Sequence, residues 1–249
     1  MAHPFYYQVF VAFVAPRSRL CQNGGIQGHL NRRKIKFQGD SHEWTVGKMV
    51  CVGQNYAKHI EEMKGTRPEK PVVFFKPSTA LLTPGETITL PDFSSHVHHE
   101  VELVVVIGRE MRRIDVGSAL NYVAGYAVGL DLTARDVQQE AKKKGGPWAI
   151  AKGFDGSAPV SEATPAEEVG DPGNLAIELR VNGEVRQSGR TSEMLFKVPD
   201  LLSYASRIFT LEPGDLLFTG TPSGVGPLAP GDELVAEIER VGRVRWQVK

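Results

Sequence analysis

The stretch His98-His99-Glu100-Val101-Glu102-Leu103-Val104-Val105-Val106-Ile107-Gly108 joins two carboxylates to a long β-branched run. A short apolar run rich in valine and isoleucine predicts a buried strand. Because side chains alternate between the faces of a strand, Glu100 and Glu102 share a face with Val104 and Val106, and the other face is apolar. Two carboxylates therefore open an element that is otherwise predicted to be buried on both faces.

This pair of carboxylates allows two interpretations. A Glu-x-Glu pair by itself is usually the solvated rim of a strand. If the start of the strand is buried, each ionised carboxylate costs several kcal/mol unless a cation or dense hydrogen bonding compensates it, and the two also repel each other. A metal ion would resolve both problems.

A second small and apolar run, residues 124–136, contains an acid just before a predicted helix. Asp131 is the candidate for a third oxygen ligand. The alternative is that Asp131 or Thr133 caps the helix, since Thr133 and Asp136 have the spacing of a capping box. Both can hold, with Thr133 as the cap and Asp131 as the ligand. An all-oxygen set without cysteine favours a hard cation over zinc.

Together the strand motif and the segment Gly129-Leu130-Asp131-Leu132-Thr133-Ala134-Arg135-Asp136 resemble the fumarylacetoacetate hydrolase family. The similarity is greatest to its short single-domain acylpyruvase and oxaloacetate-processing members, and it runs from about residue 35 to the C-terminus. It implies that Glu100, Glu102 and Asp131 hold Mg2+ or Mn2+. It also implies the family's rolled β-sandwich, assembled as a homodimer.

The rest of the sequence fits a mixed α+β, mainly β domain, because short strands alternate with frequent glycine and proline turns and only a few short helices are expected. The 249 residues carry 29 basic and 29 acidic side chains, which gives no electrostatic case for nucleic acid or an anionic membrane. No apolar stretch is long enough to span a bilayer. Cys21 and Cys51 are too few for a disulfide framework, which fits a reducing compartment. We therefore expect a cytoplasmic protein with a small-molecule partner.

The N-terminal segment differs from the rest, with an apolar patch, then basic residues, and no acid before Asp40. A secretory signal fits poorly, whereas an organelle presequence, which is basic and poor in acids, fits in part. We favour a third interpretation. Residues 1–34 are an N-terminal extension that conforms poorly to the family pattern, because the resemblance begins only after it, and residues 35–249 form the catalytic domain.

A short helix is predicted from Tyr56 to Lys64, with Asn55 as its N-cap. Within it His59 and Glu62 are three residues apart and so share a face. Without further context this is a surface ion pair, since such pairs are common and worth little. The family resemblance instead implies a catalytic dyad on a short helix that closes over the substrate.

A second helix is predicted from Thr133 to Lys144, and on it Arg135 and Gln138 share a face. The resemblance implies that both contact substrate. The lysines at positions 142–144 are most simply a solvated helix C-terminus, where cations suit the helix dipole. Lys152 stands between apolar residues, and the resemblance implies that it stabilises developing negative charge; the alternative is a lysine at a strand end. Lys76 is expected to face solvent at a strand end; the alternative is that it lines the site, because its strand precedes the strand with the two glutamates.

The glycine-rich stretch Thr219-Gly220-Thr221-Pro222-Ser223-Gly224-Val225-Gly226 lacks the lysine of a phosphate-binding loop and carries no dinucleotide fingerprint. Its glycines allow backbone amides to approach an anion closely, and Thr221 adds a hydroxyl. The resemblance implies that Gly220 and Thr221 bind the carboxylate of a 2-oxo acid.

The resemblance implies a Mg2+-dependent hydrolase that cleaves a carbon–carbon bond in acylpyruvates of the acetylpyruvate or fumarylpyruvate class. His59 and Glu62 would activate water, while Lys152 steadies negative charge. Two alternatives use the same metal site, namely oxaloacetate decarboxylation and interconversion of the enol and keto forms of oxaloacetate. A third alternative is a non-catalytic module that binds a metal or an oxo acid.

Overall fold

Strand β7 (Val101–Ile107) is central to the computed structural model, which describes residues 33–249. All seven of its residues are buried. Its odd-numbered side chains pack into one apolar cluster, and Val104 and Val106 pack into a second cluster on the other face. The predicted double burial is confirmed, and Glu100 and Glu102 precede Val104 and Val106 on the second face.

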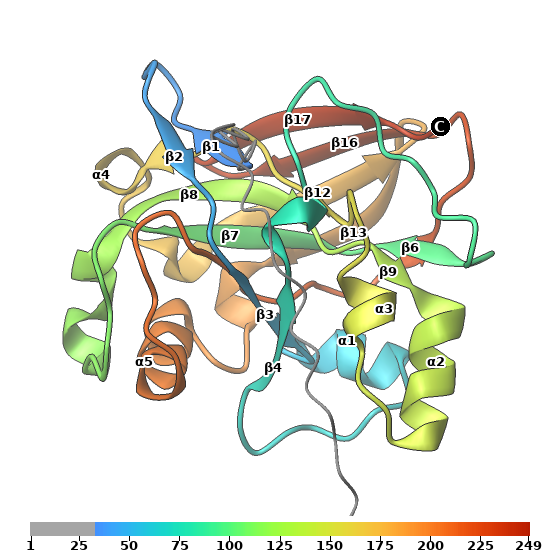
Figure 1. Cartoon of the computed structure of the whole chain (residues 1–249), viewed down its shortest axis with the longest axis horizontal. Helices are drawn as coiled ribbons and strands as arrows, with labels where there is room; N and C mark the ends of the chain where they lie inside the picture. The colour runs from blue at the N-terminus through green and yellow to red at the C-terminus, as the bar shows by residue number, and fades with distance from the viewer. Residues whose placement is uncertain (1–32) are drawn as a thin grey trace, which may run out of the picture. The chain divides into compact units, whose positions relative to one another are not determined.

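A six-stranded sheet holds β7 between two neighbours (Figure 1). Strand β8 (Val123–Leu130) pairs antiparallel with β7 on one side, and β14 (Leu216–Phe218) does so on the other. The order across the sheet is β11 (Thr164–Pro165), β8 (Val123–Leu130), β7, β14 (Leu216–Phe218), β3 (Met49–Gly53) and β4 (Val72–Lys76). This sheet supplies most of the elements that lead into the candidate site.

A four-stranded antiparallel sheet packs against the first face of β7 and encloses the larger apolar cluster, which makes a two-layer β structure. Its first hairpin turns at Asn182 and Gly183, both with positive φ, as a two-residue hairpin turn requires. The strands are β13 (Glu184–Arg190), β12 (Ala176–Val181), β16 (Glu233–Ile238) and β17 (Gly242–Gln247).

Short strands complete the rims of the two layers. Three of them form a small sheet in the order β15 (Gly226–Pro227), β6 (Val97–His99) and β9 (Thr133–Ala134). The others pair as β1 (Lys34–Lys36) with β2 (Glu43–Thr45), and β5 (Leu81–Leu82) with β10 (Ala158–Pro159). Because β6 and β9 flank the start of β7, they bring His99 and Thr133 close to the acidic motif.

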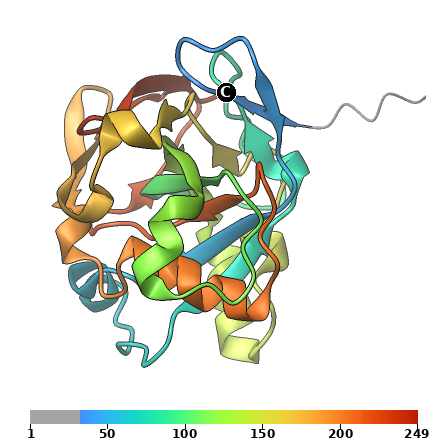
Figure 2. The same cartoon turned by 90° about the vertical axis from the view of Figure 1, so that its left-hand side faces the viewer.

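The helices are few and short, as predicted. They are α1 (Ala57–Glu62), α2 (Arg135–Lys144), α3 (Ala149–Lys152), α4 (Ala166–Val169) and α5 (Val198–Ile208), with 3-10 turns at Ser78–Ala80, Val116–Tyr122, Pro172–Asn174 and Thr191–Glu193. Helix α5 packs beside the Val116–Tyr122 turn, which Figure 2 shows from the side. Helices α1, α2 and α3 gather at the other end, near the start of β7 (Figure 1).

Two predicted caps are wrong. Asn55 does not cap α1; its amide donates to the carbonyls of Phe196 and Thr219 and accepts from the Phe196 amide. Thr133 does not cap α2, which begins two residues later without a side-chain cap, and its hydroxyl donates to Asp131 O. In both cases a polar side chain close to a helix start satisfies backbone groups elsewhere in the fold.

The predicted extension, residues 1–34, lies outside the described residues except for its last two positions. Of these, Lys34 is the first residue of β1. Within residues 33–249, no helix is both long enough and apolar enough to cross a membrane.

Candidate active site

Three carboxylates converge where β7 begins and β8 ends. Antiparallel pairing sets Val101 opposite Leu130, so Asp131 follows directly beside Glu100 and donates its amide to Glu100 O at 2.8 Å. One oxygen each of Glu100, Glu102 and Asp131 lies within 4.8 Å of the others, and all three residues are buried. The solvated-rim interpretation of the Glu-x-Glu pair is therefore excluded.

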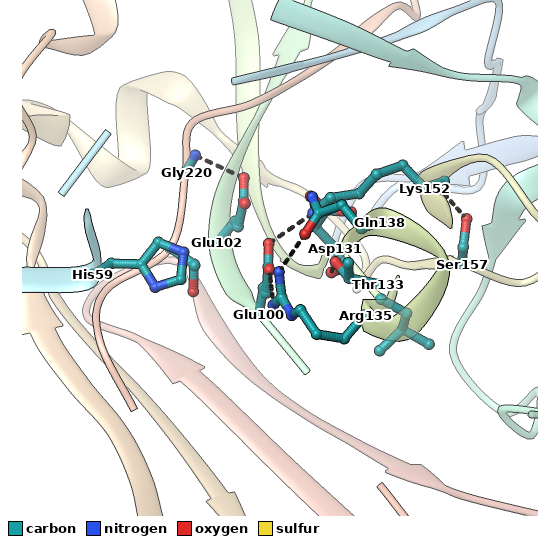
Figure 3. Close-up of polar contacts among 12 residues, drawn as sticks. His59, Glu100, Glu102, Asp131, Thr133, Arg135, Gln138, Lys152, Ser157 and Gly220 are labelled. Atoms are coloured by element: carbon teal, nitrogen blue, oxygen red, sulfur yellow. Dashed lines mark hydrogen bonds and ion pairs between the residues drawn. The ribbon is translucent and has the colours of Figure 1, made fainter. Parts of the chain in front are cut away.

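Buried cations surround two of these carboxylates (Figure 3). Lys152 Nζ lies 2.8 Å from Glu100 Oε2 and 2.5 Å from Asp131 Oδ2, and Arg135 pairs with the other oxygen of Glu100. Burial raises the pKa of Glu100, but the Lys152 and Arg135 cations outweigh burial and hold this pKa well below its usual range. Burial likewise lowers the pKa of Lys152, and the carboxylates of Asp131 and Glu100 outweigh it, so that this pKa is raised.

Among residues 33–249, no lysine or arginine forms an ion pair with Glu102. Its Oε2 accepts a hydrogen bond from Gly220 N at 2.7 Å. Burial and then the charges of Asp131 and Glu100 raise the pKa of Glu102 well above its usual range, against the effect of this amide. Here the protein alone compensates the charge of the third carboxylate incompletely.

The donor set fits a hard divalent cation. It consists of three buried carboxylates with no thiolate or imidazole among them. Asp131 Oδ1 is paired with Lys76 Nζ at 2.8 Å. The raised pKa of Glu102 is the feature that a bound cation would relieve.

Lys76 contradicts its predicted exposure, because its side chain is fully buried. The ammonium is surrounded by backbone carbonyls of Leu132 and Ser157 and by the Ser157 hydroxyl, each 3.0 to 3.2 Å away. A lysine without solvent needs such a cage and a counter-charge, which Asp131 provides. Lys76 therefore fixes Asp131 from behind the triad.

His59 and Glu62 form the expected pair on α1. His59 Nδ1 lies 3.1 Å from Glu62 Oε2, and only 7% of the His59 surface is exposed. The Glu62 carboxylate also accepts from Gly224 N, so it joins α1 to the glycine-rich turn. In Figure 3 the imidazole faces Glu100 and Glu102 from the side opposite Lys152. His59 is thus buried while Glu62 is exposed at the rim, and the catalytic role of the pair stays a prediction.

One face of α2 lines the same cleft. Arg135 donates to Gln138 Oε1 at 2.7 Å, so the two predicted substrate contacts are themselves linked. Lys142, one turn further along, also lines the cleft and lies over the Trp148 ring at 5.1 Å. Burial, followed by the charge of Arg135, lowers the pKa of Lys142. All three lysines at positions 142–144 are exposed, as predicted for a solvated helix end, and Lys142 in addition reaches the rim of the cleft.

The glycine-rich turn closes the cleft from the other side. Gly220 has φ of +97°, and a Cβ there would lie 2.7 Å from Asn55 Cβ, so only glycine fits. Its amide, predicted to bind substrate, is engaged by Glu102. Thr221 is 3% exposed and lines the cleft together with His59 and Lys152. The structure thus gathers all the predicted site residues around one cavity or directly behind it.

The sequence interpretation missed Gln187 and preferred the wrong alternative for Lys76. Gln187, on β13, contacts Thr221 and the start of β7, and Lys76 contacts Asp131. Both lie far along the chain from their partners, so no local spacing indicates them. The one available signal is a polar residue within or at the end of a predicted strand. In the structure, Gln187 is the only buried residue of β13.

Comparison with known proteins agrees with this geometry. A family model described as fumarylacetoacetate (FAA) hydrolase C-terminal matches residues 48–249. The oxaloacetate tautomerase FAHD1, mitochondrial, of Bos taurus is 50% identical over 84% of this chain and 95% of its own length. The oxaloacetate tautomerase YcgM of Escherichia coli is 50% identical over 82% of this chain and 93% of its own length.

Solved structures give the same result. The fumarylpyruvate hydrolase of Pseudomonas aeruginosa, in complex with Mn2+ and pyruvate, superposes with a TM-score of 0.84. The two sequences are 39% identical, and the match covers 87% of this chain and 95% of the hydrolase chain. These relatives are enzymes, and their named activities include both oxaloacetate tautomerisation and fumarylpyruvate hydrolysis. The chain belongs to the fumarylacetoacetate hydrolase family.

Proposed function

We propose that this protein is a divalent-metal-dependent enzyme that acts on the enol and keto forms of a 2-oxo acid. Interconversion of the two forms of oxaloacetate and hydrolytic cleavage of an acylpyruvate are its two candidate reactions. The observation that carries the proposal is the buried Glu100, Glu102 and Asp131 triad, with a histidine–glutamate pair on one side and a lysine on the other.

Charge supports this substrate class. Among the described residues of the cluster, the three carboxylates face three buried cations, Lys76, Lys152 and Arg135. The protein part is therefore close to neutral, and a divalent cation leaves two positive charges in a cleft of low dielectric. A substrate with two negative charges, such as a 2-oxo dicarboxylate, balances them.

When bound to the triad, Mg2+ or Mn2+ supplies Lewis-acid polarisation of the 2-oxo group. Lys152 Nζ, fixed by two carboxylates, holds a positive charge beside the position where the enol oxygen becomes negative. Thr221 offers a hydroxyl to the substrate carboxylate. Arg135 and Gln138 are proposed to contact the remainder of the anion from α2.

Tautomerisation needs one proton moved between carbon and oxygen, without attack by water. His59 and Lys152 face the triad from opposite sides, which would place a proton-transfer group on each side of a planar enol. The identity of about 50% with two proteins named as oxaloacetate tautomerases favours this reaction.

Hydrolysis is favoured by a different observation. Glu62 contacts His59 Nδ1, which leaves Nε2 as the atom available to take a proton from water. A water molecule activated in this way would attack the distal carbonyl, and release of pyruvate and a carboxylic acid would follow. The solved relative that holds Mn2+ and pyruvate is named as a hydrolase.

Parallel assays separate the two candidates. Metal-stripped protein, with and without Mg2+ or Mn2+, is given oxaloacetate, acetylpyruvate and fumarylpyruvate, while enol absorbance and pyruvate are followed. Metal-dependent loss of enol without pyruvate means a tautomerase, pyruvate from an acylpyruvate means a hydrolase, and pyruvate from oxaloacetate alone means a decarboxylase. No turnover of any of the three would refute the proposal.

Substitution His59→Gln tests whether the protein is a catalyst or a binding module. We expect kcat to fall about 10²- to 10⁴-fold, as when a general acid or base is lost. The Kd for Mn2+ should stay within a few-fold, because His59 lies outside the triad. Lys58→Gln, at an exposed position on the same helix, is the matched control. Unchanged turnover in His59→Gln would remove the dyad from the mechanism.

A further inference from the structure

Gln187 is a buried amide whose hydrogen-bonding capacity is fully used. Its Oε1 accepts from Val101 N at 3.0 Å and contacts His99 Nδ1 at 2.9 Å. Its Nε2 donates to Pro222 O at 2.9 Å and to Thr221 Oγ1 at 2.7 Å. The residue is completely buried and joins the four-stranded sheet to both β7 and the glycine-rich turn.

Two backbone groups fix the orientation of this amide. The Val101 N–H can only donate and the Pro222 carbonyl can only accept, so Oε1 must face Val101 and Nε2 must face Pro222. Rotating the amide by 180° would oppose like groups at both ends. The roles of the two side-chain partners follow from this orientation.

Thr221 must accept from Nε2, so its own proton points away from Gln187. Within residues 33–249, the Thr221 hydroxyl donates no hydrogen bond, and it lines the cleft beside Glu100, Glu102 and Lys152. Its free proton is therefore available only to what occupies the cleft. Because the hydroxyl already accepts from Gln187, it is oriented to donate its proton toward the cleft.

A β-bulge in β13 lies directly beside Gln187. The register between β12 and β13 shifts beside it, since Leu179 pairs with Gln187 while Arg180 pairs with Val185. Arg186 is the extra residue of a β-bulge, a device that redirects side chains near functional sites. The bulge turns Gln187 inward on a strand whose other side chains are exposed or half-buried.

We propose that Gln187 is a positioning residue that locks Thr221 as a hydrogen-bond donor to an anionic oxygen of the substrate. This rests on the proposed function, in which Thr221 meets the carboxylate of a 2-oxo acid. The lock favours a carboxylate, which only accepts, over an amide or alcohol that presents a donor at the same place. Gln187 itself never touches the substrate.

A double-mutant cycle tests the lock with pyruvate as the probe, bound to Mn2+-loaded protein and measured by calorimetry. Gln187→Glu keeps the size of the side chain and its acceptor oxygen, but it replaces the Nε2 donor by a second acceptor oxygen. The Thr221 hydroxyl is then expected to donate to this new carboxylate instead of to the substrate. Thr221→Val removes the hydroxyl. We expect each variant to weaken pyruvate binding about tenfold, as for loss of a hydrogen bond to a charged group. In the Thr221→Val background, Gln187→Glu should cost less than about twofold.

Additive losses would overturn the proposal, because Gln187→Glu would then act through its charge or through the fold. Gln247→Glu is the matched control. The side-chain amide of Gln247 donates to Glu233 on the exposed face of the four-stranded sheet. Replacing this glutamine by glutamate should therefore leave the Kd for pyruvate unchanged. The Kd for Mn2+ is measured in every variant, so that pyruvate binding always refers to loaded protein.

A ligand-free readout separates this proposal from the proposed function. The fixed amide requires the proton of His99 to sit on Nδ1, which imidazole 15N shifts report, with His99 assigned from a His99→Gln variant. A proton on Nε2 alone would refute the lock. If the wild type binds no pyruvate, the 2-oxo acid site is refuted together with this use of Thr221, whereas an Nδ1 proton would still support the fixed amide.

Discussion

The protein pairs acidic with basic side chains in two very different settings. At the start of β7, Lys152 and Asp131 have side chains only 4% and 2% exposed. On the outer face of the four-stranded sheet, Arg245 pairs with Glu233 at 3.2 Å while 63% of the arginine side chain is exposed. The same chemical groups therefore meet with and without water.

Burial decides what each set of charges does. Water screens the outer pairs, which are typically worth about 0–1 kcal/mol each. In the inner cluster, removal of one partner leaves the other ionised without water, at a cost of about 3–5 kcal/mol. The buried charges of this cluster therefore depend on one another. Glu102 shows this, because burial and its acidic neighbours raise its pKa.

The largest expected effect comes from Lys76→Met, which keeps the length of the side chain and removes its charge. Asp131 loses the cation behind it, so the free energy of unfolding should fall by about 3–5 kcal/mol, measured by urea denaturation of the metal-free protein. A loss below about 1 kcal/mol would mean that the inner pair behaves like an outer one.

A smaller effect is expected from Glu102→Gln. In the wild type, Mn2+ at a free concentration 100 times its Kd should add about 2.7 kcal/mol to the free energy of unfolding. The variant should lose most of this gain. Without metal it should unfold near the wild type, because an amide resembles the protonated carboxyl that the raised pKa of Glu102 favours.

Calorimetric melting with and without Mn2+ provides this measurement, and Glu237→Gln on the outer sheet is its control. An undiminished metal-dependent shift in Glu102→Gln would remove this residue from the metal site.

The smallest effect should come from Arg245→Met, the counterpart of Lys76→Met on the outer sheet. We expect the free energy of unfolding to change by less than about 1 kcal/mol, and any change to shrink further in high salt, because the pair is exposed. Urea denaturation at two ionic strengths measures it. A loss comparable to that of Lys76→Met would erase the distinction between the two settings.

The sequence predicts those parts of the site that depend on local periodicity. Alternation along β7 places Glu100 and Glu102 on one face, and helical spacing places His59 beside Glu62. Both expectations are confirmed. The resemblance of the Asp131 segment to a known family adds the third carboxylate, which the strand pairing brings to Glu100.

Contacts between segments distant in sequence could not be predicted. Asn55 is a residue type that often caps helices, but its side-chain amide instead donates to backbone carbonyls of two later segments. Lys76 looks like a strand-end lysine until the chain segment near Ser157 folds over it. Gln187 carries no local signal, since its role depends on a bulge and on Thr221. Each miss is a buried polar group whose partners come from elsewhere in the fold.

The double burial of β7 also bears on how such a protein diversifies. The strand that leads from two of the three buried carboxylates is held by an apolar cluster on each face, so a change there threatens the fold and the candidate metal site together. The outer part of the cleft is lined by residues of α2 and the segment after it, such as Lys142 and Trp148, which are not locked in either cluster. Under the proposed function, sequence variation should therefore alter which acid is accepted long before it alters the reaction.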